Sequence, residues 1–244
     1  MDNNRLKKFP VIATTIFLCI ELVFFVLIML GPGNLIGIFE FSSIAIVFCF
    51  SLLFFAKVPI IILTEVALFF TMTADFFLEI VTPMMQAVAM TSFLLVQLCY
   101  FARLFIELKT KKWRIINLSI RAVAILIATL ITILVLKDHF DYLSCVSIVY
   151  FANLLLNIAL AFAEFKVSPL FAFGLLLFLG CDIFIGLQAA AGVYLDIPTT
   201  SLLYQIIFMP FNIAWFCYLP SQVLIATSLV HKRITLQVKT TQEL

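Results

Sequence analysis

Two aspartates, Asp75 and Asp182, are the residues best placed to do chemistry in this sequence. Asp75 lies in the apolar run 58–81, six residues before its end, and Asp182 lies in the run 168–190, eight residues before its end. At a helical rise of 1.5 Å per residue, both carboxyl groups would lie roughly 9–12 Å from the same membrane surface. If the two helices are parallel, the carboxyl groups share one layer, and we predict that they act together in proton transfer.

Acids outnumber bases inside the apolar runs. Of the thirteen Asp and Glu residues six fall in these runs, whereas Arg121 is the one base assigned to a span interior, since Arg103 and Arg114 lie near span ends and are assigned to the cytoplasmic side. A charge at the centre of a membrane costs roughly 2.5–3.5 kcal/mol, so desolvation favours the neutral form of such carboxyl groups. A neutral carboxylic acid can donate a proton to a substrate. The six acids are Glu21, Glu40, Glu65, Asp75, Glu79 and Asp182.

Further polar side chains recur at helical spacing, which places each set on one face of its helix. We predict that they support catalysis or bind substrate, although hydrogen bonding between helices is the alternative interpretation for any one of them. We expect Arg121 instead to extend toward the cytoplasmic surface. The candidates are Glu79, one turn beyond Asp75, together with Gln97, Tyr100, Tyr150, Asn153, Asn157, Tyr218 and Gln222.

The sequence predicts neither a metal nor another cofactor. The six cysteines lie singly in apolar runs without CxxC spacing, and the two histidines, His139 and His231, are far apart. No HExxH or GxxxxGK[ST] motif is present, so zinc-peptidase and P-loop chemistry have no basis. The basic segment 103–114 is interpreted as a determinant of topology that contacts anionic lipids, and no nucleic-acid partner is predicted.

Helices that cross a membrane must position these residues. The chain has 244 residues, of which 65% are hydrophobic and 11% charged, whereas a soluble domain carries about 25% charged residues. This composition excludes a soluble catalytic or nucleic-acid-binding domain. We predict an all-α fold, a polytopic helical membrane bundle of about eight transmembrane helices in a single domain, 1–244. The spans are about 10–30, 35–56, 58–81, 84–106, 113–136, 142–163, 168–190 and 201–230.

The distribution of basic residues predicts the orientation of the bundle. With a cytoplasmic N-terminus, thirteen of the fifteen Lys and Arg residues fall on the cytoplasmic side, Lys137 lies opposite, and Arg121 is inside a span. By the positive-inside rule, both termini are therefore expected in the cytoplasm. A bacterial plasma membrane is the favoured location, with the endoplasmic reticulum membrane expected in a eukaryote. The last run is long and contains Pro210 and Pro220, which predict kinks or a re-entrant start.

Three segments carry a resemblance to a known family. They read TADFFL at 73–78, GLLLFLGCD at 174–182 and YLPSQVLI at 218–225. Together they resemble the YhhN-like, or lysoplasmalogenase, membrane proteins, whose eight spans contain segments of the form GD-x-x-L, G-x-x-x-F-x-x-SD and Y-x-x-(A/S)Q-x-L-I. The likeness extends from about the second span to the end of the chain.

The resemblance implies hydrolysis of the vinyl ether of lysoplasmalogens, giving a fatty aldehyde and a glycerophospho-alcohol, with membrane lysophospholipids as partners and no metal. It assigns the paired acids to Asp75 and Asp182. It assigns supporting polar roles to Tyr150, Tyr218 and Gln222. The chain departs from the family pattern where Ala74 replaces Gly, Cys181 replaces Ser and Gln97 replaces a frequent His.

Three other functions compete with this interpretation. Acids within a membrane are typical of ion pathways, so a cation- or proton-coupled transporter using Glu21, Glu65 and Asp75 is the main alternative. An intramembrane aspartyl protease also pairs two aspartates, but its YD and GxGD motifs are missing from the sequence. A structural or sensory protein without catalysis would fit the departure at Gln97.

Overall fold

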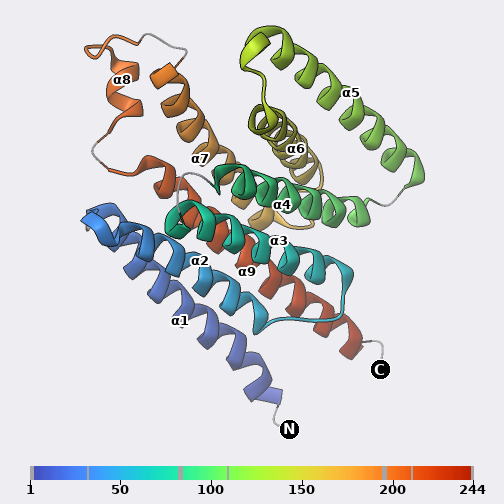
Figure 1. Ribbon diagram of the computed structural model, residues 1–244. Helices are drawn as coiled ribbons and strands as arrows, with labels where there is room; N and C mark the ends of the chain where they lie inside the picture. The colour runs from blue at the N-terminus through green and yellow to red at the C-terminus, as the bar shows by residue number, and fades with distance from the viewer. Residues whose placement is uncertain are drawn as a thin grey trace.

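The computed structural model describes residues 3–31, 33–81, 85–108, 110–193, 197–209 and 211–242. All regular secondary structure in these ranges is helical, which confirms the predicted all-α fold. Eight of the helices are long and apolar enough to cross a membrane. The chain is therefore a multi-pass integral membrane protein built as one bundle (Figure 1).

The helices follow the apolar runs of the sequence closely, except at the C-terminal end. The long helices are α1 Asn3–Leu30, α2 Ile36–Leu52, α3 Pro59–Asp75, α4 Gln86–Glu107, α5 Lys111–Leu136, α6 Tyr142–Ala163, α7 Pro169–Val193 and α9 Ile213–Gln242. The short ones are η1 Gly33–Leu35, η2 Phe76–Val81, η4 Lys137–His139 and α8 Leu202–Ile207. The expected run 201–230 thus contains α8 and most of the membrane-crossing part of α9. Pro220 lies inside α9, and Pro210 lies outside the described residues.

Local sequence signals explain where several helices begin. Pro59 and Pro169 are the first residues of α3 and α7, where the fixed φ of proline suits a helix and its missing N–H costs nothing. The Thr110 side chain accepts a hydrogen bond from the Trp113 amide, 3.3 Å away, at the start of α5. Such caps satisfy backbone donors that the first helical turn leaves free.

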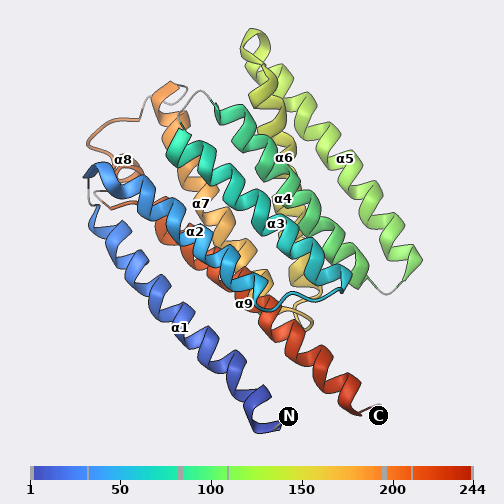
Figure 2. The same cartoon turned by 60° about the horizontal axis from the view of Figure 1, so that its bottom comes forward.

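Helix α9 runs through the middle of the bundle and packs against α1, α2, α3 and α7. Helix α5 lies at the edge and packs mainly on α6. Figure 2 shows both chain termini at the same end of the bundle, here called the terminal end. The opposite end holds the connections that follow α3, α5 and α7.

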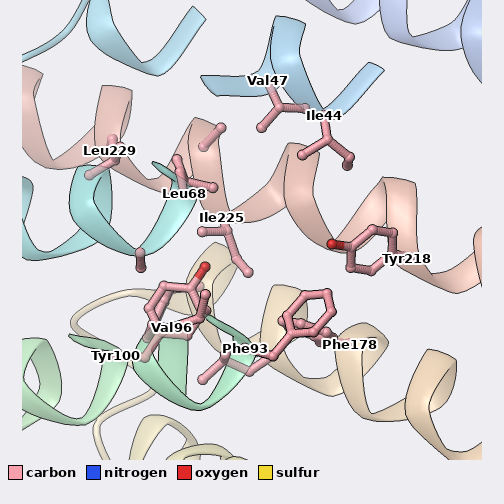
Figure 3. Packing of buried hydrophobic residues seen from close by; sticks show 14 of the residues in the cluster. Ile44, Val47, Leu68, Phe93, Val96, Tyr100, Phe178, Tyr218, Ile225 and Leu229 are labelled. Atoms are coloured by element: carbon pink, nitrogen blue, oxygen red, sulfur yellow. The ribbon is translucent and has the colours of Figure 1, made fainter. Parts of the chain in front are cut away.

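The hydrophobic core lies where α2, α3, α4, α7 and α9 meet (Figure 3). Helices α7 and α9 approach closely at Gly174. A Cβ atom at this position would lie 2.7 Å from Cγ1 of Ile225, so only glycine allows the contact. Core residues in this region include Ile44, Val47, Leu68, Val96, Phe178, Ile225 and Leu229.

Candidate active site

Asp75 is the last residue of α3, where the chain changes from an α-helix to the π-helical turn η2. Its side chain is 2% exposed. The Tyr218 hydroxyl, on α9, donates a hydrogen bond of 2.7 Å to Oδ2 of Asp75. π-Helical turns are rare and frequently occur at functional sites, so the backbone conformation is a second reason to consider Asp75 a functional residue.

Asp182 is held in the same way on the other side of the bundle. It lies on α7, and the Tyr150 hydroxyl, on α6, donates a hydrogen bond of 2.5 Å to its Oδ2. The half-buried Asp182 is more accessible than Asp75. Four helices therefore supply two matched pairs, each consisting of a tyrosine hydroxyl and an aspartate carboxyl group.

Both pairs open into one cavity with a volume of about 790 Å³. Its walls come from α3, η2, α4, α5, α6, α7 and α9 and are mainly apolar. Phe93 connects the two pairs, because its ring centroid lies 6.0 Å from that of Tyr150 and 6.5 Å from that of Tyr218. The fold thus brings Asp75 and Asp182, 107 positions apart in the sequence, to the same cavity.

Glu79, on the π-helical turn, also lines the cavity. Helix α2 packs directly behind this turn at Gly37. A Cβ atom at Gly37 would lie 2.8 Å from the backbone carbonyl oxygen of Glu79, so the absence of a side chain permits the contact. The same helix carries Glu40, whose Oε1 accepts a 3.1 Å hydrogen bond from Nδ2 of Asn212. Helix α2 therefore supports the cavity from behind.

Three of the predicted site residues form a separate network. Arg121, on α5, donates hydrogen bonds to Oδ1 of Asn153 and to Oδ1 of Asn157, the latter at 2.9 Å. Asn157 in turn donates to Oε1 of Gln97 at 3.0 Å. Of the stripe Tyr150, Asn153 and Asn157, only Tyr150 lines the cavity. The two asparagines and Gln97 thus connect α4, α5 and α6.

The expectation that Arg121 extends toward the cytoplasmic surface is wrong. Its side chain does not extend toward the membrane surface but is 5% exposed, and its guanidinium carbon lies 3.9 Å from the ring centroid of Phe101. Two amide oxygens and an aromatic face satisfy the cation locally. The sequence alone does not show which helix faces α5, so these partners were not predictable.

Tyr100 and Gln222 are fully buried in the core. Neither lines the cavity. The Tyr100 ring packs edge-on against Phe171, with 5.2 Å between centroids. Gln222 follows Tyr218 by one turn on α9, and helical spacing places both on the same face.

Aromatic wall residues of the site were missed in the sequence. Phe93, Phe178 and Trp215 line the cavity, and Trp215 packs at 90° against Tyr218, with 5.0 Å between centroids. The spacing of three between Trp215 and Tyr218 was a usable signal, because it places both on one face of α9. The same signal was available for Phe178, which precedes Asp182 by four residues on α7.

Among the described residues, no three His, Cys, Asp or Glu side chains are positioned to bind one metal ion. The site is lined by three carboxyl groups, those of Asp75, Glu79 and Asp182, by the phenols of Tyr150 and Tyr218, and by apolar walls.

An apolar cavity lined by the carboxyl groups of Asp75, Glu79 and Asp182, within eight membrane-crossing helices, defines a multi-pass membrane protein with an intramembrane acid site. The family model of the YhhN family matches residues 38–229, which is more than half of the chain. The protein therefore belongs to the YhhN family, and the matched segment includes Asp75, Tyr150, Asp182 and Tyr218. Comparison with curated proteins and with solved structures gave no match.

Proposed function

We propose that the protein is an intramembrane hydrolase that cleaves the vinyl ether bond of lysoplasmalogen-type lysophospholipids. The products are a fatty aldehyde and a glycerophospho-alcohol. Membership of the YhhN family is compatible with this reaction. The observation that carries the proposal is that Asp75 and Asp182 open into one apolar cavity, each beside a tyrosine hydroxyl.

The chemistry needs one protonated and one ionised carboxyl group. The acid transfers its proton to the outer vinyl carbon, which leaves an oxocarbenium ion stabilised by the nearby carboxylate. Water adds to the cationic carbon, and its proton passes to that carboxylate. In the resulting hemiacetal, the hydroxyl proton returns to the first aspartate, while the second protonates the departing ether oxygen. The C–O bond breaks, and both carboxyl groups regain their starting states.

The two aspartates suit these roles because they line the same cavity. We propose that they share one proton, because carboxyl groups that interact do not readily ionise together. The phenols of Tyr150 and Tyr218 fix the orientation of the carboxyl groups. The apolar walls fit the single hydrocarbon chain of a lysolipid, and the volume of about 790 Å³ is within the usual range for ligand pockets.

The test is to incubate the purified protein in detergent with a panel of lysophospholipids that includes a vinyl-ether species, and to measure the aldehyde released. We expect aldehyde from the vinyl-ether lipid alone. Loss of release in both Asp75→Asn and Asp182→Asn would support the proposal, with Asp138→Asn, an exposed acid in the connection after α5, as the control. Robust turnover by either site variant would refute paired-acid catalysis.

A transport assay distinguishes the main alternative. If no lipid is cleaved, but the same two substitutions abolish ion-dependent flux in liposomes, the protein is a transporter and the hydrolase proposal is wrong.

A further inference from the structure

A second layer of polar side chains lies directly behind the pair formed by Asp75 and Tyr218. Thr71 precedes Asp75 by four residues on α3, and Gln222 follows Tyr218 by four residues on α9. Because α3 runs away from the terminal end and α9 runs toward it (Figure 2), both steps lead about 6 Å deeper into the bundle. Thr71 and Gln222 therefore lie at one level, a turn behind the catalytic pair.

Tyr100 completes this layer from α4. Helical side chains lean toward the N-terminal end of their helix, so the Tyr100 hydroxyl lies closer to the level of Asp75 than its own backbone does. The hydroxyl lies next to the side chain of Thr71 without meeting hydrogen-bond geometry. Figure 3 shows the hydroxyl groups of Tyr100 and Tyr218 turned into the core, with Ile225 between them in this view.

The layer is sealed, yet its polar atoms lack protein partners. Thr71, Tyr100 and Gln222 are each 0% exposed. Within the described part of the chain, nothing bonds to Nε2 or Oε1 of Gln222 or to Oη of Tyr100. Thr71 donates its hydroxyl hydrogen to the Ala67 carbonyl at 3.0 Å, which leaves its oxygen free to accept.

Buried donors and acceptors are costly unless they are hydrogen-bonded. In protein interiors such groups are commonly satisfied by internal water, which makes about three hydrogen bonds at each site. The layer offers this number with the right polarity, since the Gln222 amide both donates and accepts, the Tyr100 hydroxyl does either, and the Thr71 oxygen accepts.

We propose that Thr71, Tyr100 and Gln222 form an internal water-binding site, and that the water bound there is the nucleophile of the hydrolysis. This rests on the proposed function. When the lipid chain fills the apolar cavity, it displaces water from the front of the site, whereas water held behind Asp75 remains. The bound water moves past Asp75 into the cavity. Its oxygen bonds to the oxocarbenium carbon and its proton passes to the Asp75 carboxylate, so that Asp182 is the initial acid.

Two substitutions test the site, and a third serves as a control. Gln222→Leu and Thr71→Val remove polar atoms of the layer with little change in volume. Thr227→Val, also on α9, is the matched control, because the Thr227 hydroxyl bonds to carbonyls of its own helix, those of Val223 and Leu224, at 2.8 and 3.1 Å. If one layer variant fails to fold, the other still tests the proposal.

The first measurement does not depend on activity. Brief synchrotron radiolysis converts bound water to hydroxyl radicals, which oxidise the side chains beside it, and mass spectrometry locates the product. We expect oxidation of Tyr100 in the wild type and in Thr227→Val, and its loss in both layer variants. Phe50, buried against Phe17, is the dry aromatic reference. An unmodified Tyr100 in the wild type, or equal modification in Gln222→Leu, overturns the water site.

The second measurement is aldehyde release from the vinyl-ether lysolipid. We expect kcat to fall about tenfold in both layer variants, which corresponds to one lost hydrogen bond, with KM unchanged. If Tyr100 oxidation is lost while kcat is unchanged, the bound water is not the nucleophile. If Tyr100 is oxidised but the wild type cleaves no lipid, the water site stands and the hydrolase function is the part that fails.

Discussion

The Tyr218 hydroxyl lies 2.7 Å from Oδ2 of Asp75, and this hydrogen bond joins the middle helix α9 to the end of α3. Tyr150 and Asp182 repeat the arrangement between α6 and α7. The two phenols orient the two carboxyl groups toward one cavity without neutralising them, because a phenol carries no charge at neutral pH.

Removing either phenol should therefore reduce catalysis. Tyr218→Phe and Tyr150→Phe keep the ring contacts and delete one hydrogen bond to a carboxylate, so we expect kcat/KM for aldehyde release to fall about 10- to 100-fold. Tyr142→Phe is the matched control, because the Tyr142 hydroxyl contacts Thr91 at 2.9 Å and does not line the cavity. Unchanged kcat/KM in Tyr218→Phe would contradict the orienting role.

Because α2 contacts the π-helical turn at Gly37, we predict that a larger residue at this position destabilises the protein. In Gly37→Ala the new methyl group meets the Glu79 carbonyl oxygen at 2.8 Å, and overpacking of this kind costs about 1–3 kcal/mol. We expect a lower thermal unfolding midpoint in detergent and slower aldehyde release. Gly186→Ala is the control for stability, because its added methyl group meets no atom of another helix within 4 Å among the described residues. Equal midpoints in both variants would show that α2 does not support the turn.

The buried cation of α5, Arg121, predicts which of two substitutions lowers the thermal unfolding midpoint more. Arg121→Met removes the charge together with its hydrogen bonds, whereas Asn157→Leu leaves the charge buried with one amide partner fewer. An uncompensated buried charge is the larger penalty, so Asn157→Leu should lower the thermal unfolding midpoint more than Arg121→Met. The reverse order would mean that Arg121 reaches water once Asn157 is lost.

Asp141, at the start of α6 and outside the membrane-crossing segment, predicts a pH effect. Hydrogen bonds from the Ser144 hydroxyl and backbone amide lower the pKa of this exposed carboxyl group. Its contribution to stability is therefore fully present above the pKa of the unfolded chain and is lost as pH falls through the lower folded-state pKa. Asp141→Ala should lower the unfolding midpoint at neutral pH, with the difference vanishing in acid. A difference independent of pH would contradict this account.

Sequence reasoning reached the helical architecture, and it placed Asp75 and Asp182 at a similar depth, because helix geometry is regular. Composition and run length fix the number of membrane-crossing helices, and the constant rise of a helix fixes depth, so the common layer of Asp75 and Asp182 followed from counting residues. Depth says nothing about which helices are neighbours. The partners of Arg121, and the contact between Glu40 and Asn212, 172 positions apart, depend on helix packing and were out of reach.

The periodic stripe on α6 shows that spacing predicts which residues share a helix face but not what that face contacts. Tyr150, Asn153 and Asn157 do share a face, as their spacing indicated. That face spans two environments, because Tyr150 meets the cavity and the asparagines meet Arg121. The π-helical turn after Asp75 was also unpredicted, because no local sequence signal used to predict the helices marks it.

The most direct test of the central claim, that Asp75 and Asp182 act as one catalytic unit, is a double-mutant cycle on aldehyde release. Residues that act as a unit have non-additive effects. We predict that the double variant, Asp75→Asn with Asp182→Asn, releases aldehyde no more slowly than the slower single variant. If the two losses instead multiply, the aspartates act independently, and the paired-acid account is contradicted.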